Sequence, residues 1–273
     1  MVSLSSDSVL SQSPALTAGR QRAYAADKLF LAGEHYSVRL ARNRDEIAQA
    51  QRLRFEIFNL ELSEGLENSY LSGRDQDDFD AVCDHLLVIH NLSGEIVGTY
   101  RMQTGITAAR NLGYYSAQEF DFSPYESRRA EIVELGRACI HKQHRNISAL
   151  NLLWRGIAAY AEQRDARYLI GCSSLTSQDP RLGATTFRNL FHQFMVSDEL
   201  MTEPLPRYAF CLDEIYETCP PPPRLLRAYL NIGAKVCAAP AMDREFKTID
   251  FLTLMDLQNL PPLTTNRYLN RTA

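Results

Sequence analysis

The 273-residue sequence lacks several features that would assign it to a common class at once. Its six cysteines form no C-x-x-C pair, so the spacing of a structural zinc site is absent. No run of about 18 apolar residues occurs, which excludes a helix of membrane-spanning length. Because no basic end precedes an apolar stretch, no signal peptide is expected. We therefore expect a cytoplasmic protein with reduced, buried thiols.

Strong charge of either sign is also missing. The net charge is −4 and the pI is near 5.9, so no general attraction to nucleic acid or anionic membranes is expected. Hydrophobic residues make up 45% and charged residues 23%, which is typical of a globular protein with a substantial core. We expect a flexible, Ser- and Ala-rich arm over 1–35, a core domain over 36–200, and an extension over 201–273 packed on it.

Hydrophobic periodicity predicts a mixed α/β sheet. A strand is predicted over 36–42, followed by a helix that Asn43 or Asp45 caps. Further strands are predicted over 85–90, 96–104, 131–140 and 167–175, with helices over about 148–161 and 180–200. Residues 105–129 are aromatic and irregular, as in a covering segment. After the prolines at 220–223, a short helix and two more strands are predicted.

The strand "VELGRACI" carries charge in its middle. Glu134 and Arg137 have an odd spacing, so a regular strand would place them on opposite faces. A β-bulge near Gly136 would bring both side chains to one cleft, and a structural ion pair at a sheet edge is the alternative.

Where this strand ends, the chain becomes basic. Lys142 and Arg145 precede a helix that Asn146 or Ser148 caps, and the first turn of a helix can bind an anion such as phosphate. A solvated basic turn is the alternative.

These elements together resemble a known family. The stretches are "LRFEIF" (53–58), "DQDDFDAVCDHLLVI" (75–89), "GEIVGTYRMQT" (94–104), "VELGRACIHKQHRN" (133–146), "LNLLWRGIAAY" (150–160), "IGCSSL" (170–175) and residues 233–257. They resemble GNAT-fold N-acyltransferases, and more narrowly the ornithine-lipid branch with its hemolysin-like and long-chain N-acyl amino acid synthase relatives. Acyl-homoserine-lactone synthases are related to these. The resemblance implies a GNAT-like mixed central sheet with a bulged strand, flanking helices and a C-terminal extension.

The resemblance also implies an activity, which is transfer of a long-chain (3-hydroxy)acyl group to the α-amine of an amino acid, most simply ornithine. Glu134 would be the general base, directly or through water. Backbone N–H groups near Cys139 and Ile140 would hold the oxyanion. Arg101 and Arg137 would bind the acceptor carboxylate or the acyl hydroxyl. A Cys139 nucleophile paired with a nearby histidine is a formal alternative.

Several further residues receive two interpretations each. Asp78 and Asp80 would attract the acceptor's ammonium groups, or would hold their acidic loop through ion pairs with Arg54. Phe58, like Phe55 and Trp154, would line an acyl pocket or belong to the core.

The donor is expected to be an acyl-phosphopantetheine thioester. Residues 145–150 lack the glycines that allow close backbone approach to the diphosphate of coenzyme A. This favours acyl carrier protein, which is acidic and would dock on Lys142, Arg145, Arg155 and Arg164. No bound cofactor or metal is expected.

A lipid product implies peripheral contact with the inner membrane. The apolar residues after the prolines would form an interfacial patch or pack on the sheet; they are Leu225, Leu226, Tyr229 and Leu230.

Two other functions remain open from the sequence. One is an acyl-homoserine-lactone synthase or an N-acyltransferase with another acceptor. The other is a catalytically silent GNAT-like module that binds a carrier or a lipid.

Overall fold

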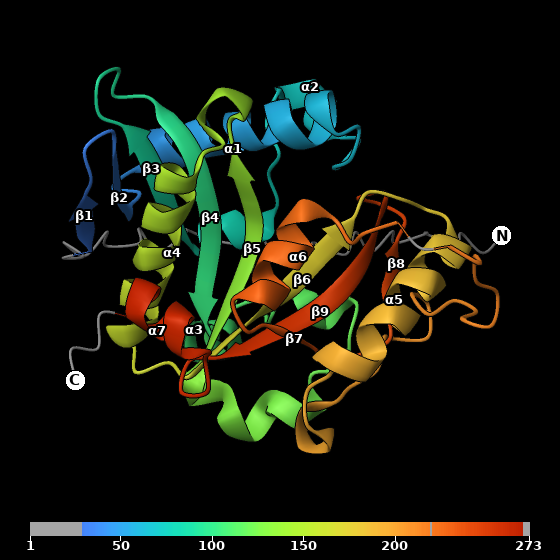
Figure 1. Ribbon diagram of the computed structural model, residues 1–273. Coiled ribbons are helices and arrows are strands. Elements are labelled where there is room, and N and C mark those ends of the chain that lie inside the picture. Colours follow the sequence, from blue (N-terminus) through green and yellow to red (C-terminus); the bar gives the residue numbers. More distant parts are fainter. Residues whose placement is uncertain (1–28, 219, 270–273) are drawn as a thin grey trace, which may run out of the picture.

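The computed structural model describes residues 29–218 and 220–269, and its centre is one mixed β-sheet (Figure 1). The strand order is β1-β2-β3-β4-β5-β6-β9-β7, and β8 pairs with β9. Neighbouring strands are antiparallel except β5 and β6, which are parallel. The strands are β1 (Phe30–Ala32), β2 (Tyr36–Leu40), β3 (Asp84–His90), β4 (Ile96–Thr104), β5 (Ile132–Ile140), β6 (Tyr168–Leu175), β7 (Lys235–Val236), β8 (Ala241–Asp243) and β9 (Thr248–Asp256).

Helices cover both faces of this sheet. They are α1 (Arg44–Phe55), α2 (Ser69–Ser72), α3 (Gly105–Arg110), α4 (Ile147–Glu162), α5 (Pro180–Phe194), α6 (Arg224–Asn231) and α7 (Pro262–Tyr268). Of the predicted caps, Asn43 accepts a hydrogen bond from the Glu46 N–H, and Asn146 accepts one from the Ala149 N–H. A π-helical turn over Glu56–Glu61, which the sequence did not indicate, continues α1.

Strand alternation separates two environments. On one face, Tyr100, Val133 and Leu135 join the largest core cluster together with α4 and residues of α6 and α7. On the other face, Cys139 packs with Leu53 of α1, and the segment over 105–131 covers the sheet beside it. We call this second side, which carries Glu134 and Arg101, the acidic face.

A β-bulge interrupts the pairing of β4 with β5. Cys139 lies opposite Thr99 and Gly136 lies opposite Arg101, so two residues of β5 face Tyr100 alone. This confirms the predicted bulge, but the residue with left-handed backbone is Arg137, at φ 52°, rather than Gly136. Such a conformation costs a non-glycine residue roughly 1 kcal/mol, so contacts of its side chain must hold it there.

Three predictions concern the chain's outer segments. Strand β1 and buried Leu29 lie within the expected flexible arm, because pairing with β2 satisfies the backbone there; residues 1–28 lie outside the described residues. The segment beyond residue 200 supplies β7 to β9, so it continues the sheet as well as packing on it. Of the two interpretations of the apolar residues after the prolines, packing against the core is confirmed: Leu226, Tyr229 and Leu230 are buried, and Leu225 alone of that group is exposed.

Candidate active site

Glu134 lies at the centre of the acidic face and is only 3% exposed. Its Oε2 accepts hydrogen bonds from Gln103 Nε2 (2.7 Å) and the Tyr115 N–H (2.9 Å), and its Oε1 accepts one from the Ser116 N–H (2.8 Å). A carboxylate has about four acceptor positions, so one on Oε1 stays open. The covering segment therefore orients this carboxylate while leaving it able to take a proton.

The bulge brings Arg137 to the same face as Glu134. Arg137 donates to the Tyr115 hydroxyl (3.2 Å) and to Asp77 (3.2 Å), and its Nε lies 3.3 Å from Asp75. Burial opposes its charge, but Tyr115 and the two aspartates raise its pKa well above the ordinary value. Tyr115 therefore contacts both Glu134 and Arg137, which the bulge places on the same face of the sheet.

The bulge bears on the expected oxyanion site. Cys139 and Ile140 pair in register with Thr99 and Gly98, and the ladder is disturbed at Arg137 and Ala138. Because the His141 N–H donates to Val97 of β4, the Ile140 N–H points to the other side of β5, where pairing with β6 ends at Glu134. An oxyanion site near Cys139 and Ile140 therefore stays a prediction, and the bulge adds Arg137 and Ala138 to the candidates.

A network of three arginines and three aspartates surrounds the bulge. Arg54 pairs with Asp75 (2.7 Å) and Asp80 (2.8 Å), and Arg101 pairs with Asp77 (2.5 Å) and Asp80 (3.2 Å). Burial opposes ionisation of Asp80, yet Arg54 and Arg101 hold its pKa far below the usual range. The ion pair with Arg54 that the sequence left open is thus present.

The other substrate-binding candidates lie elsewhere. Asp78 is exposed, whereas its neighbours in the network point inward. Phe58 packs against Phe246, with ring centroids 5.4 Å apart, in the apolar cluster that contains Cys139. Arg101 keeps one buried nitrogen, Nη2, without a hydrogen-bond partner between the rings of Phe79 and Tyr115.

Cys139 lies in an apolar environment unsuited to a nucleophile. Burial raises the pKa of its thiol to about 12, and its neighbours are Leu53, Ile57 and Phe58. The nearby His144 is occupied elsewhere, because its Nδ1 contacts the Tyr36 hydroxyl (3.1 Å). The geometry gives no support to a cysteine–histidine pair.

The basic turn before α4 is partly occupied by contacts of its own. Arg145 makes a bidentate pair with Glu61 (2.5 and 2.8 Å) and donates to the Ile140 carbonyl. Lys142 and Ser148 are exposed, and Asn146 is the helix cap. Of the four carrier-binding candidates, Lys142 is the cation at this turn for which the structure shows no acidic partner among the described residues.

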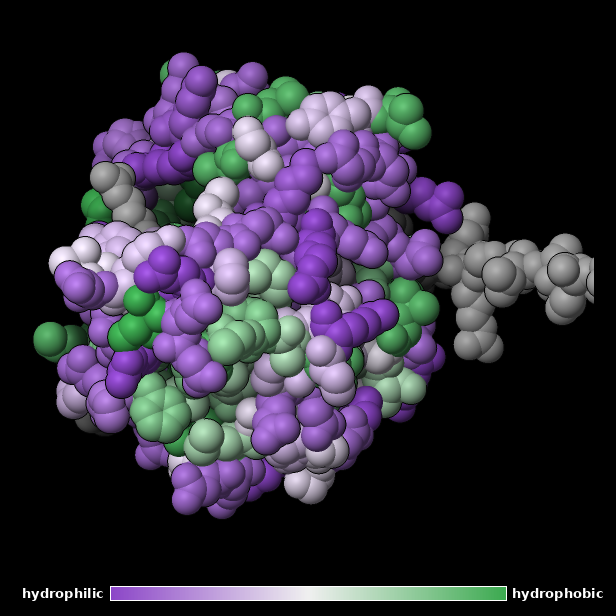
Figure 2. Space-filling view, turned by 90° about the vertical axis from the view of Figure 1, so that its right-hand side faces the viewer, coloured by the Kyte–Doolittle hydropathy of each residue, from purple (hydrophilic) through white to green (hydrophobic). Residues whose placement is uncertain are grey.

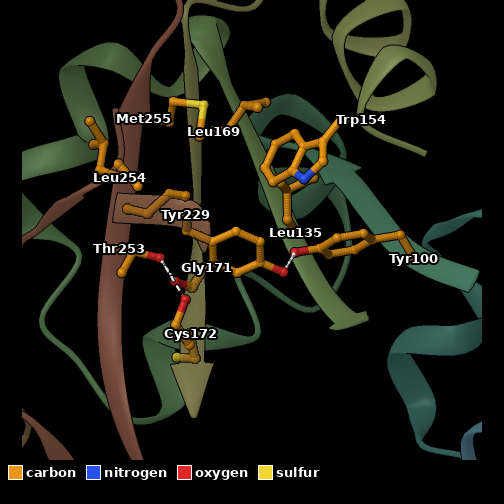
Figure 3. A pocket seen from close by; sticks show the side chains of 13 residues that line it. Tyr100, Leu135, Trp154, Leu169, Gly171, Cys172, Tyr229, Thr253, Leu254 and Met255 are labelled. Atoms are coloured by element: carbon orange, nitrogen blue, oxygen red, sulfur yellow. Dashed lines mark hydrogen bonds between the residues drawn. The ribbon is translucent and has the colours of Figure 1, made fainter. Parts of the chain in front are cut away.

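Between β5 and β6 the sheet opens. The two strands pair only from Ile132 to Glu134, and a Cβ at Gly171 would lie 2.1 Å from the Leu135 carbonyl oxygen, so only glycine fits at the point of closest approach. Beyond it, Tyr229 of α6 reaches into the opening and shares a 2.9 Å hydrogen bond with the Tyr100 hydroxyl (Figure 3).

The space left beside Tyr229 is small. The cavity is about 30 Å³ and is lined by Leu135, Trp154 and Gly171 among others (Figure 3). That is room for about two water molecules and too little for an acyl chain. Trp154 does line this opening, but α6 must shift before a thioester can enter.

Sequence reasoning missed several residues of this site. Gln103, Tyr115 and Asp77 hold the charged groups. Gln103 and Asp77 lie in stretches that carry the family resemblance but were assigned no role, and Tyr115 lies outside those stretches. Tyr115 could have been suspected from the aromatic segment predicted to cover the sheet. Its contact with Glu134 uses backbone N–H, which no residue type signals.

Comparison with known proteins places this architecture. Residues 53–155 match the model of the acetyltransferase (GNAT) domain. The structure of the acyl-homoserine-lactone synthase LasI is similar, with a TM-score of 0.51 at 14% identity, over 87% of this chain and 96% of the other. The N-acyl amino acid synthase FeeM from uncultured soil microbes has a TM-score of 0.50 at 9% identity, covering 86% and 94%. The protein is an acyltransferase with a GNAT-like fold.

Curated relatives identify the family within this class. The L-ornithine N(alpha)-acyltransferase of Agrobacterium fabrum is 32% identical over 81% of this chain and 81% of its own length. That of Rhizobium meliloti is 32% identical over 85% and 82%, and that of Brucella abortus is 30% identical over 85% and 87%. This chain belongs to the L-ornithine N(alpha)-acyltransferase family.

The surface adds one observation. Among the residues described, no helix is both long and apolar enough to cross a membrane. The side of the molecule that carries α5 is largely hydrophilic, with hydrophobic residues in limited groups (Figure 2).

Proposed function

We propose that this chain transfers a long-chain (3-hydroxy)acyl group from the thioester of acyl carrier protein to the α-amine of ornithine. The observation that carries this proposal is the position of Glu134 in the bulged strand β5, at the edge of the opening between β5 and β6. Its carboxylate is buried and has one open acceptor position. Family membership supports the same reaction class.

The chemistry follows from the state of the amine. An α-amino group has a pKa near 8, so most of it is protonated at neutral pH and cannot attack. Glu134 takes this proton, directly or through one water, and the free amine attacks the thioester carbonyl. The bond from nitrogen to carbon forms and the carbon–sulfur bond breaks. The nitrogen then loses its second proton to the departing sulfur, so the product is an amide and the carrier leaves as a thiol.

The tetrahedral oxyanion needs hydrogen-bond donors that are already in position. The backbone N–H groups of Arg137 and Ala138 are the candidates, since the bulge withdraws this part of β5 from regular pairing. The cationic Arg137 side chain lies beside them. Its ion pairs keep the strained backbone in place, so it acts as a positioning residue as well as a local positive charge.

The donor enters from the opening between β5 and β6. The turn before α4 has no glycine that would admit a diphosphate, which favours the single phosphate of a phosphopantetheine arm. Exposed Lys142 offers a charge to an acidic carrier protein. Lys142→Glu should raise KM for acyl carrier protein several-fold at low salt and leave KM for the matching acyl-coenzyme A unchanged.

Because the product is a lipid, we also expect peripheral contact with a membrane. Exposed apolar side chains gather near α2, where Leu71 is 92% exposed, Leu60 59% and Tyr70 52%. We propose that this end of the molecule touches the bilayer. Co-sedimentation with anionic vesicles should fall in Leu71→Asp, and equal binding of both proteins would contradict the assignment.

The decisive test measures thiol release and lipid mass with acyl carrier protein and a panel of amino acids. Glu134→Gln should lower kcat about 10²- to 10⁴-fold, the range of general base catalysis. Glu131→Gln, an exposed neighbour, is the matched control and should keep full activity. If no amino acid released thiol while the carrier still bound, the binding-module function would replace this proposal.

A further inference from the structure

A second group of buried acids lies on the acidic face, outside the arginine–aspartate network. Glu119, Cys172 of β6 and Asp250 of β9 place one ligand atom each within 4.8 Å of one another. Glu119 is 2% exposed and Asp250 is 5% exposed. Cys172 and Ser174, on the same face of β6, are partly exposed as residues.

This group has negative charge without a matching cation. Glu119 and Asp250 hydrogen-bond to each other, and Asp250 also contacts the Ser174 and Thr248 hydroxyls, while Glu119 Oε2 and Asp250 Oδ1 accept from no donor of the described residues. Within the described ranges, neither carboxylate forms an ion pair with a lysine or an arginine. Arg137 is the cation whose field reaches Glu119, but Asp75 and Asp77 already neutralise it. A positive group is therefore missing at this position.

Other acids make the deficit larger. Asp243 lies close to both carboxylates and uses its Oδ1 to accept the N–H groups of Glu245 and Phe246 (2.9 Å each). Glu64, which accepts from the Thr176 hydroxyl, also faces Asp250. Burial, followed by the charge of neighbouring acids, raises the pKa of Glu119 well above its ordinary value and that of Asp250 to about 6.

The group lies on the same face of the sheet as Glu134. Glu134 is paired with Ile170, and Cys172 lies two residues further along the same face of β6, about 7 Å from Ile170 at the rise of a strand and about 8 Å from Glu134 when the spacing of the two strands is included. The turn over Ser116–Gln118 joins the two places, because the Ser116 N–H binds Glu134 and Glu119 follows that turn. The two amines of ornithine are five bonds apart, or about 6 Å when extended.

We propose that Glu119 and Asp250 bind the side-chain ammonium group of a cationic amino acid acceptor while its α-amine lies at Glu134. This assignment rests on the proposed function and adds the residues that select the acceptor. An ammonium group has three donors and one positive charge, which suits two carboxylate oxygens left without partners. A metal ion is the weaker occupant, because burial keeps the Cys172 thiol protonated and metal ligands must lose their proton.

The test compares two acceptors that differ only in the distal amine. Ornithine is used beside 2-aminopentanoic acid, which has the same chain without that amine. Glu119→Gln and Asp250→Asn should each raise KM for ornithine about 10- to 100-fold, the loss expected for a charged hydrogen bond. The ratio of kcat/KM between the two acceptors should fall by the same factor, and KM for the acyl donor should not change.

Controls separate this site from a structural role. Glu203→Gln removes an exposed acid and should leave the ratio as in the wild type. Both test variants should keep an unfolding temperature at least equal to the wild type, since each removes a repelling charge. An unchanged ratio in folded Glu119→Gln and Asp250→Asn would overturn the assignment.

Cys172→Ser distinguishes the metal. Under the proposal it keeps the acceptor ratio within about threefold, because an ammonium group does not need the thiol. Binding of one Zn²⁺ that is lost in Cys172→Ser, with an acceptor ratio insensitive to Glu119→Gln, would establish a metal site in its place.

Failure of the proposed function would be visible separately. If the wild type acylates no amino acid, calorimetry with ornithine and donor-free protein still tests the site. Binding to the wild type that Glu119→Gln abolishes would support the ammonium site alone, and absence of binding to both would overturn it.

Discussion

Two clusters of buried charge lie on the same face of the sheet and have opposite balance. In the first, Arg54, Arg101 and Arg137 face Asp75, Asp77 and Asp80, so three positive charges meet three negative ones. In the second, Glu119 and Asp250 face each other and Asp243, and no lysine or arginine in the described part of the chain forms an ion pair with either of the two.

The difference separates a scaffold from a binding site. Removing charges from water costs several kcal/mol for each ion unless a partner offsets it. The balanced cluster contains its own partners, and it holds Arg137 in the strained bulge. The unbalanced cluster should lower the stability of the protein without ligand. Such a loss of stability is expected of a site that binds a positively charged group.

Breaking the balanced cluster should give the largest effect. Asp80→Asn removes one of the two carboxylates that pair with the fully buried Arg54. We therefore expect a loss of about 3 to 5 kcal/mol in the free energy of unfolding. Urea denaturation followed by circular dichroism measures it. Exposed Asp78→Asn is the matched control and should cost less than about 0.5 kcal/mol. A loss below about 1 kcal/mol in Asp80→Asn would contradict a structural role for this network.

The same kind of change in the unbalanced cluster should have the opposite sign. Burial and the neighbouring acids disfavour the ionised form of Glu119, which the unfolded chain adopts freely at pH 8. Glu119→Gln removes this penalty, so the empty protein should gain about 1 to 2 kcal/mol in the free energy of unfolding at pH 8. The same denaturation measurement applies. Destabilisation by this variant would show that Glu119 has a structural partner.

The two clusters should also differ in pH dependence. The folded pKa of Asp80 lies below its unfolded value, so its contribution is present above about pH 4 and is lost as the pH falls. The folded pKa of Asp250 is raised to about 6, so its contribution is full below about pH 4 and is lost as the pH rises through 6.

Stability of the empty protein should therefore be greatest near pH 4, fall by roughly 1 to 2 kcal/mol between about pH 4 and 6, and receive little further change from Asp250 at higher pH. Asp250→Asn should flatten this fall, and an unchanged profile in that variant would assign the fall to other groups. The charged and titratable groups that face Asp250 are Glu64, Glu119, Cys172 and Asp243, with Arg137 beyond Glu119.

The smallest effect is expected at Cys139. Its thiol, with a pKa near 12, is not ionised at neutral pH, and its backbone lies in the regular part of the ladder. Cys139→Ala should keep kcat within about threefold, because the proposed reaction needs no covalent enzyme intermediate. Loss of activity with trapping of an acyl-cysteine in the wild type would restore the cysteine–histidine alternative.

Much of the fold was predictable from local pattern. Alternation located β2 to β6, and the stripe of apolar residues located α4. The odd spacing of Glu134 and Arg137 indicated the bulge, although it could not show that Arg137 rather than Gly136 adopts the left-handed backbone. Side-chain ion pairs decided that, and a sequence does not reveal them.

The candidate site was only partly predictable. Glu134, Arg137 and the Arg54–Asp80 pair were named from the sequence, but Glu119, Asp250 and Tyr115 were not. These three come from a covering segment and a distant strand, so their roles depend on contacts more than 18 residues away. The choice between an interfacial patch and packing on the sheet also needed the structure, in which Tyr229 turns inward to Tyr100.

The sequence by itself determined the succession of strands and helices along the chain and the caps at Asn43 and Asn146. It also determined the charged strand on which the chemistry depends. These follow from hydrophobic period and side-chain hydrogen bonding over a few residues. Only the tertiary structure decided which charges are neutralised and which are not. That balance depends on long-range contacts inside a low-dielectric interior. There, a carboxylate paired with an arginine stabilises the fold, whereas a carboxylate without such a partner can bind a cationic ligand.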